Sequence, residues 1–112
     1  MERMGRVWGY YRVIHEIGEH TKVKELTVDP GAMLSMQKHS ERAEHWFVAE
    51  GEATVYTIKN DERVLLGKFK QHESLHIEKY QWHRLCNETT QPLKVIEIQY
   101  GESCREEDIE RK

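Results

Sequence analysis

Hydrophobic residues recur at every second position along most of this chain, which is the period of a β-strand. Residues 74–77 and 95–100 alternate between apolar and polar side chains, and residues 54–58 are rich in β-branched and aromatic types. By the same criteria, further strands are expected at residues 23–28, 34–37, 46–49, 64–66 and 82–86. No segment has the pattern of a long amphipathic helix.

Turn-forming residues separate these runs. Asp29-Pro30-Gly31 is the strongest turn signal, because proline fixes φ and glycine accepts a positive φ. Further turns are expected at residues 50–51, 59–61 and 88–92. Short strands at this spacing favour an all-β fold, an antiparallel sandwich or barrel.

The length of 112 residues suffices for one hydrophobic core, so we expect a single domain over residues 1–112. The acidic segment from residue 102 to residue 112 is the one place where a helical turn is considered. Ser103 and Glu106 have the spacing of a capping box there. The same segment is equally compatible with an extended or frayed end.

Charge and cysteine content narrow the function classes. Lysine and arginine total 17 against 20 acidic residues, a net charge of −3, whereas proteins that bind nucleic acids or membrane surfaces favour a basic excess. No apolar run approaches the roughly 20 residues of a spanning helix, and the first six residues lack the apolar stretch of a secretory signal. Two cysteines, Cys86 and Cys104, are too few for a disulfide scaffold. We therefore expect a cytoplasmic protein with reduced thiols and with no nucleic-acid or membrane partner.

The predicted strand at residues 95–100 carries unexpected polarity. Glu97 and Gln99 alternate with Ile96, Ile98 and Tyr100. A half-exposed strand with a polar outer face explains this pattern. So does a barrel whose interior is partly polar because it holds a ligand.

The segment from residue 31 to residue 51 carries the candidate chemistry. Gln37 and His39 are two residues apart, so on one strand their side chains point the same way. Glu44 lies five residues beyond His39, and the chain must bend between them if all three side chains are to meet. His83, on the predicted strand 82–86, offers a fourth donor.

These four side chains suit a divalent metal ion. Two imidazoles, one carboxylate and one amide oxygen, without a thiolate, leave Zn²⁺, Mn²⁺, Fe²⁺, Co²⁺ and Ni²⁺ open. A Gln-x-His pair on a strand is usually just a pair of exposed polar residues, so the spacing alone does not decide between the two interpretations.

The same residues resemble the two cupin motifs. Gly31, Gln37, His39, Glu44 and Gly51 follow the spacing of the first motif, with glutamine in place of its first histidine. His83 and Asn87 match the spacing of the second motif. Glu78 and Tyr80 stand where that motif has proline and glycine, so the turn geometry is open at this point.

A narrower resemblance spans nearly the whole chain. The sequence is similar to the C-terminal cupin domain of type II phosphomannose isomerases, the half that follows the nucleotidyltransferase in bifunctional mannose-1-phosphate guanylyltransferase/mannose-6-phosphate isomerase. The most specific stretches are residues 42–46, Arg-Ala-Glu-His-Trp, and residues 107–111, Glu-Asp-Ile-Glu-Arg. Others are residues 6–11, 22–24, 26–28, 30–31, 34–37, 82–85 and 96–102. The family often has histidine where this chain has Glu41.

The resemblance implies a single-domain cupin, a jelly-roll β-sandwich or barrel, that interconverts mannose 6-phosphate and fructose 6-phosphate through an enediol. It also implies that Gln37, His39, Glu44 and His83 hold the metal ion, with zinc expected first. A metal-bound residue is a poor base. Glu97 is therefore the first candidate for the catalytic base and His76 the second, whereas His45, next to Glu44, is expected to face away.

The phosphate of the implied hexose-phosphate substrate requires cations. The candidates come from segments that match the family: Arg6, Lys22, Lys24 and Arg84. Arg111 is a further candidate, because a tail that folds over the mouth of the barrel closes the site against water.

Two other function classes stay open. One is a cupin module that binds a metal or a sugar without turnover, and the other is a different metal-cupin enzyme, such as another sugar isomerase, an epimerase or an oxygenase. Guanylyltransferase activity is not expected, because the chain has no glycine-rich phosphate loop. We expect a homodimer formed through edge strands.

Overall fold

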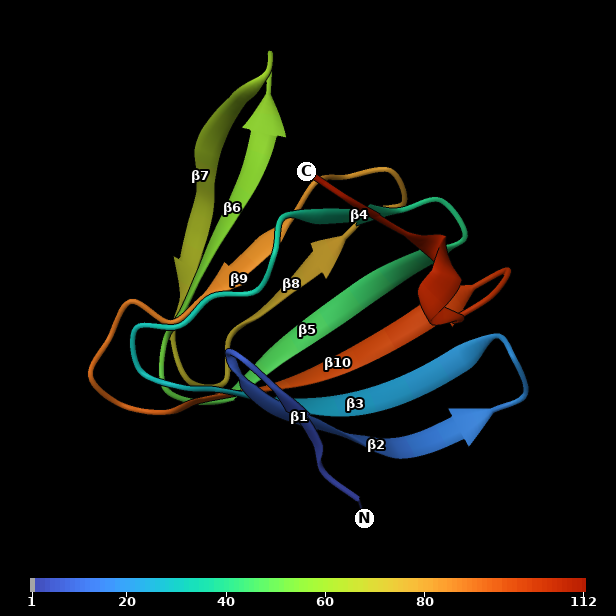
Figure 1. Cartoon of the computed structure of the whole chain (residues 1–112), viewed down its shortest axis with the longest axis horizontal. Helices are drawn as coiled ribbons and strands as arrows, with labels where there is room; N and C mark the ends of the chain where they lie inside the picture. Colours follow the sequence, from blue (N-terminus) through green and yellow to red (C-terminus); the bar gives the residue numbers. More distant parts are fainter. Residues whose placement is uncertain (1) are drawn as a thin grey trace.

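The computed structural model describes residues 2–112, whose regular structure is almost entirely β-strand (Figure 1). The strands are β1 (Met4–Arg6), β2 (Gly9–Ile17), β3 (Thr21–Val28), β4 (Gln37–His39), β5 (Arg42–Glu50), β6 (Ala53–Lys59), β7 (Glu62–Phe69), β8 (Ser74–Ile77), β9 (Arg84–Cys86), β10 (Leu93–Gly101) and β11 (Ile109–Arg111). One turn of 3₁₀ helix, η1 (Glu106–Asp108), precedes β11. The all-β prediction is confirmed.

Three sheets organise these strands. Six strands form the largest sheet in the order β1-β2-β3-β10-β5-β8, three form a second sheet in the order β7-β6-β9, and β11 pairs with β4. Every strand pair is antiparallel. Figure 1 shows the β6–β7 hairpin projecting beyond the rest of the molecule and the C-terminal segment, in red, crossing beside β4.

The hydrophobic core lies between the two larger sheets. Its buried side chains come from β3, β5, β8 and β10 on one side and from β6 and β9 on the other: Leu26, Val28, Trp46, Val48, Ala53, Val55, Leu75, Ile77, Leu85, Leu93 and Val95. Burying such side chains away from water supplies the main driving force for folding.

The interior changes from apolar to polar along the strands. On β10, the inward-facing residues Val95, Glu97 and Gln99 are all buried, with Glu97 6% and Gln99 1% exposed. Ile98 and Tyr100, which alternate with them, face outward and are 37% and 41% exposed. Of the two interpretations of this strand, the structure supports the barrel with a partly polar interior.

The sequence pattern does not predict β2, although it is nine residues long. Its register against β3 shifts between Val13 and His15, so Ile14 is an extra residue in a β-bulge. The bulge breaks the alternation on which the prediction rests. Residues 34–36, predicted as a strand, lie outside β4; Leu34 N–H donates to the Leu85 carbonyl of β9 at 2.9 Å.

Two residues near the second motif have a positive φ although neither is glycine. Tyr80, where the motif has glycine, has a φ of 65°. His72, six residues before Glu78, has a φ of 72°. The left-handed region is unfavourable for a residue with a Cβ atom. The surrounding structure therefore imposes this backbone on two residues that do not favour it.

The C-terminal segment folds back onto the turn between β4 and β5. The Asp108 carboxylate accepts hydrogen bonds from Ser40 Oγ at 2.6 Å, from Ser40 N–H at 3.1 Å and from Glu41 N–H at 2.8 Å. Arg105 donates two hydrogen bonds to Glu41, at 2.9 and 3.1 Å. Ser103 does not cap η1, whose N-cap is Arg105. The capping-box prediction is wrong, and most of the segment is held by tertiary contacts.

Among residues 2–112, no helix has the length and apolarity needed to cross a bilayer. Cys86 and Cys104 are both buried and are not joined in a disulfide.

Gly101 ends β10 where two stretches of backbone meet. Its φ is 151°, and an added Cβ would lie 2.4 Å from the Glu41 carbonyl oxygen and 2.9 Å from Arg42 Cα. Both atoms are backbone atoms and cannot rotate away. We expect Gly101→Ala to lower the free energy of unfolding by about 2 kcal/mol or more, measured by urea denaturation. Gly5→Ala is the control, because nothing lies within 4 Å of the added Cβ. Equal stability of the two variants would contradict this account.

Asp108 makes the attachment of the C-terminal segment depend on pH. Burial alone would raise the pKa of Asp108, but the hydrogen bonds from Ser40 and Glu41 hold it below its ordinary value of 3.8. Because the folded pKa is below the unfolded one, the ionised carboxylate stabilises the fold above about pH 4. This stabilisation is lost as the pH falls through the folded pKa.

We therefore expect Asp108→Asn to lower the melting temperature at pH 7, and the difference from the wild type to shrink at pH 3. Circular dichroism at both pH values measures it. A difference that stays constant would show that the charge of Asp108 does not stabilise the turn.

Candidate metal centre

Strands β4 and β5 and the residue that precedes β9 bring the candidate ligands to one place. Gln37 and His39 lie on β4, and Gln37 pairs with His83 through two backbone hydrogen bonds of 2.9 and 2.8 Å. Directly opposed residues on antiparallel strands present their side chains on the same face. The chain bends at residues 40–41, and Glu44 then faces inward from β5. The predicted bend is confirmed.

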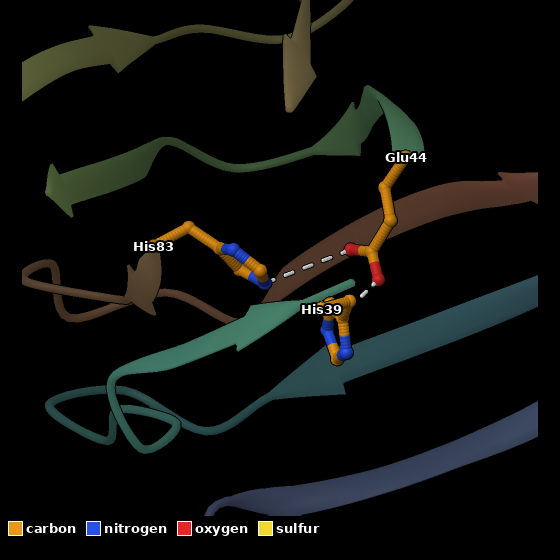
Figure 2. Close-up of side chains that lie close together, drawn as sticks. All are labelled: His39, Glu44 and His83. Carbon is orange, nitrogen blue, oxygen red and sulfur yellow. Dashed lines mark ion pairs between the residues drawn. The ribbon is translucent and has the colours of Figure 1, made fainter. Parts of the chain in front are cut away.

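The side chains of His39, Glu44 and His83 point toward one another (Figure 2). Glu44 Oε2 lies 3.3 Å from His39 Nε2, and Glu44 Oε1 lies 3.8 Å from His83 Nε2. One potential ligand atom from each residue lies within 4.8 Å of the other two, and all three residues are buried. The centre is therefore a compact cluster of two imidazoles and one carboxylate.

This cluster fits a divalent cation. Ligand atoms at about 2.1 Å from one ion lie roughly 3 to 4.2 Å apart, and both contacts of Glu44, each made by a different carboxylate oxygen, fall in that range. Burial lowers the pKa of His39 to about 4, so its imidazole is neutral at pH 7 and retains a lone pair. The Nδ1 atom of His39 is buried without a hydrogen-bond partner. The amide nitrogen of Gln37 donates to Ser35 Oγ at 2.9 Å, and Gln37 lines the same cavity as Glu44 and His83.

Glu44 is held by two residues that the sequence analysis does not single out. Arg42 Nε donates to Glu44 Oε2 at 3.0 Å, and Trp46 Nε1 donates to Glu44 Oε1 at 2.9 Å. Arg42 Nη2 also lies 3.2 Å from His39 Nε2. Burial by itself raises the pKa of Glu44, but His83, Arg42 and His39 together lower it to about 2. Both residues lie two positions from Glu44 on β5, so the strand period was a usable signal.

The centre opens into a cavity of about 320 Å³. Glu97 lines it and is buried, and its Oε1 accepts a hydrogen bond from Gln99 Nε2 at 2.6 Å. Burial, and secondly the negative charge of Glu44, raise the pKa of Glu97 to about 8. A carboxyl group outside the ligand cluster that exchanges a proton near neutral pH is suited to acid–base chemistry.

The C-terminal segment supplies one wall of this cavity through Glu106, Ile109 and Arg111. Glu106 Oε1 accepts a 2.6 Å hydrogen bond from Lys24 Nζ, which lies 4.5 Å from the centre of the Tyr11 ring. This position follows from the contacts of the segment with residues 40–41 and from the pairing of β11 with β4. The sequence alone did not reveal Glu106 as a cavity residue.

Four residues predicted to bind substrate or take part in catalysis line the cavity: Arg6, Lys24, Glu97 and Arg111. Three others do not, and the structure corrects these predictions. His76 is exposed on β8, 3.4 Å from Glu78, because Leu75 and Ile77 take the inward positions.

Lys22 and Arg84 also lie outside the cavity. Lys22 Nζ donates to the Cys104 carbonyl at 3.3 Å and lines a second, smaller cavity. Arg84 lies on β9, paired with Tyr56 of β6. His45 faces away from Glu44, as predicted, with its ring 6.4 Å from that of His76.

Comparison with known proteins points to one family. A family model described as "Mannose-6-phosphate isomerase C-terminal" matches residues 2–112. The chain is 43% identical over 106 residues to "Alginate biosynthesis protein AlgA" of Pseudomonas putida and 44% identical over 106 residues to "Mannose-1-phosphate guanylyltransferase ManC" of Salmonella typhimurium. Each alignment covers 95% of this chain and 21% of the relative. The chain thus spans about a fifth of the length of these relatives.

Solved structures share the fold. A tryptophan-to-phenylalanine variant of Bacillus subtilis oxalate decarboxylase superposes with a TM-score of 0.83, covering 99% of this chain and 30% of that chain at 16% identity. A formate complex of oxalate decarboxylase from Lactobacillus farciminis gives 0.77, covering 90% of this chain and 31% of that chain, also at 16% identity. At such identity the likeness shows the fold alone, which is the predicted cupin fold.

The cluster makes a direct prediction about metal binding. We expect His39→Ala and Gln37→Ala to weaken the binding of Zn²⁺ or Mn²⁺ by at least about 100-fold, since even the loss of a hydrogen-bond partner of a ligand costs 10- to 100-fold. Titration calorimetry and elemental analysis measure the loss, and circular dichroism checks the fold. His45→Ala, next to Glu44 but facing away, is the control. Equal affinity of all three variants would show that the cluster binds no metal.

Proposed function

This chain belongs to the mannose-6-phosphate isomerase C-terminal family, and we propose that it is a metal-dependent mannose-6-phosphate isomerase. The observation that carries the proposal is the cluster of His39, Glu44 and His83, which adjoins a cavity that also contains the buried carboxyl group of Glu97. An aldose–ketose isomerase needs both parts, a site that stabilises an oxyanion and a base that carries a proton.

In this proposal Gln37, His39, Glu44 and His83 hold a divalent cation, with Zn²⁺ first and Mn²⁺, Fe²⁺, Co²⁺ or Ni²⁺ as alternatives. When bound, the cation supplies Lewis-acid stabilisation of the negative charge that develops on the sugar oxygens. Arg42 and Trp46 keep the Glu44 carboxylate oriented toward the two histidines.

Glu97 moves the proton between the two carbon atoms of the open-chain sugar. Its carboxylate removes the proton from C2 of mannose 6-phosphate while the C1 oxygen gains a proton, which gives the enediol. Glu97 then returns its proton to C1 and the hydroxyl group on C2 loses its own, which gives fructose 6-phosphate. Gln99 positions Glu97 through the 2.6 Å hydrogen bond.

A coupled assay of mannose 6-phosphate conversion, with elemental analysis of the same preparation, tests the proposal. We expect activity that is lost on chelation and restored by the metal. Glu97→Gln should lower kcat by about 100-fold or more, because general-base catalysis contributes 10²- to 10⁴-fold. Its metal content should stay unchanged.

Glu25→Gln is the control, since Glu25 lies on β3 at an ion-pair distance of 3.8 Å from Arg12 and does not line the cavity. Full activity in a metal-free sample would contradict the role of the metal. Metal binding without turnover would instead identify a binding module. The homodimer stays a prediction that light scattering can test.

A further inference from the structure

Two of the four cationic side chains in the cavity already have an acidic partner. The Nζ atom of Lys24 lies 2.6 Å from Glu106 Oε1, and Arg42 Nε lies 3.0 Å from Glu44 Oε2. Both cations are buried, with exposed fractions of 6% and 3%. Such a pair is costly to break, because the buried cation would be left without compensation; Glu44 is buried as well, whereas the Glu106 side chain is 48% exposed.

The other two cations, Arg6 and Arg111, are exposed and have no acidic group within 4.0 Å among residues 2–112. Arg6 donates to the Gly5 carbonyl at 2.7 Å and to the Tyr11 hydroxyl at 3.3 Å. Arg111 Nε donates to Ser35 Oγ at 3.3 Å. A guanidinium has five N–H donors, so each of these arginines retains donors for a ligand.

Ser35 adds a hydroxyl proton to this group. Its Oγ accepts hydrogen bonds from Gln37 Nε2 at 2.9 Å and from Arg111 Nε at 3.3 Å. A hydroxyl has two acceptor lone pairs and one O–H donor, so the donor remains available once both lone pairs are used. Ser35 lines the same cavity as Arg6 and Arg111.

We propose that Arg6, Arg111 and Ser35 form the phosphate clamp of this cavity, and that Lys24 is a structural cation neutralised by Glu106. A phosphate monoester carries a charge of about −1.5 to −2 near pH 7 and has three strong acceptor oxygens. Arginine matches such a group with a planar fork of donors. Phosphate reaches the clamp without an acidic group beside it, whereas at Lys24 it would lie next to the Glu106 carboxylate, whose negative charge opposes it. The identity of the sugar rests on the proposed function, but the clamp does not.

The clamp joins the two ends of the chain. Arg6 ends β1, and Arg111 lies on β11, where it is paired with Gln37 of β4. In the proposed clamp a phosphate that contacts both arginines links β1 to β11, which is itself paired with the strand that carries Gln37 and His39.

Calorimetric titration of the full chain with inorganic phosphate and with mannose 6-phosphate tests the clamp. A hydrogen bond to a charged group changes a binding affinity by a factor of about 10 to 100. We therefore expect Arg6→Met and Arg111→Met each to lower the affinity for both ligands by that factor. Ser35→Ala should give a smaller loss. Arg63→Met is the matched control, because Arg63 lies 4.3 Å from the centre of the Tyr56 ring, as Arg6 lies 5.0 Å from that of Tyr11, but outside the cavity.

Unchanged phosphate affinity in both arginine variants would overturn the clamp, as would the absence of phosphate binding by the wild type. So would a greater loss in the double variant Lys24→Met/Glu106→Gln, which removes the ion pair without leaving one charge alone. Loss of phosphate binding in the arginine variants of a protein that isomerises no sugar would support the clamp and refute the proposed isomerase. Turnover of mannose 6-phosphate with a wild-type KM in those variants would support the proposed isomerase and refute the clamp.

Discussion

A buried carboxylate, that of Glu44, is the constraint on which the polar half of this structure depends. A carboxylate only 1% exposed is unfavourable unless charges and donors compensate it. Arg42, Trp46 and His83 surround it, and His39 completes the cluster. These partners come from β4, from β5 and from the residue just before β9, so the same interaction that keeps one charge inside the protein fixes these three segments relative to one another. A divalent cation bound there adds positive charge where the fold already provides for a negative one.

The same constraint explains why this part of β10 has polar side chains on its inner face and apolar side chains on its outer face, the opposite of an ordinary half-buried strand. The residues next to Glu44 across the sheet must be compatible with a charge, and Gln99, which pairs with Glu44 in register, meets that need. Glu97 and Gln99 are therefore inside, and Ile98 and Tyr100 are left on the outer face. The hydrophobic core extends to the other end of the sandwich, where Val48, Leu93 and Val95 are fully buried. It meets the polar cluster at Trp46, which packs in the core and donates to Glu44.

The sequence predicts those features that depend on neighbouring residues and misses those that depend on distant parts of the chain. The period of two located β6, β8 and β10 because their alternation is regular, and it failed for β2 because a bulge interrupts it. It showed that Glu97 and Gln99 share a face, but the side that this face takes depends on Glu44, which lies on β5, distant in sequence and adjacent to β10 only in the folded sheet. The position of Glu106 could not be predicted from the sequence, because it depends on the pairing of β11 with β4 in the folded protein. The backbone conformation of Tyr80 could not be predicted either, because its φ of 65° is imposed by the surrounding structure.

Burial also determines which cations of the cavity have an acidic partner. An unpaired arginine deep in the protein loses its hydration without compensation, so Arg42 and Lys24 are accompanied by carboxylates. At the mouth, water solvates a guanidinium until a ligand arrives, and only there can Arg6 and Arg111 remain unpaired at little cost. A ligand with one strongly anionic end therefore has one favourable orientation, with that end at the mouth. In the proposed isomerase this orientation directs the opposite end of the sugar phosphate, which carries the reacting C1 and C2 atoms, toward Glu97 and the candidate metal centre.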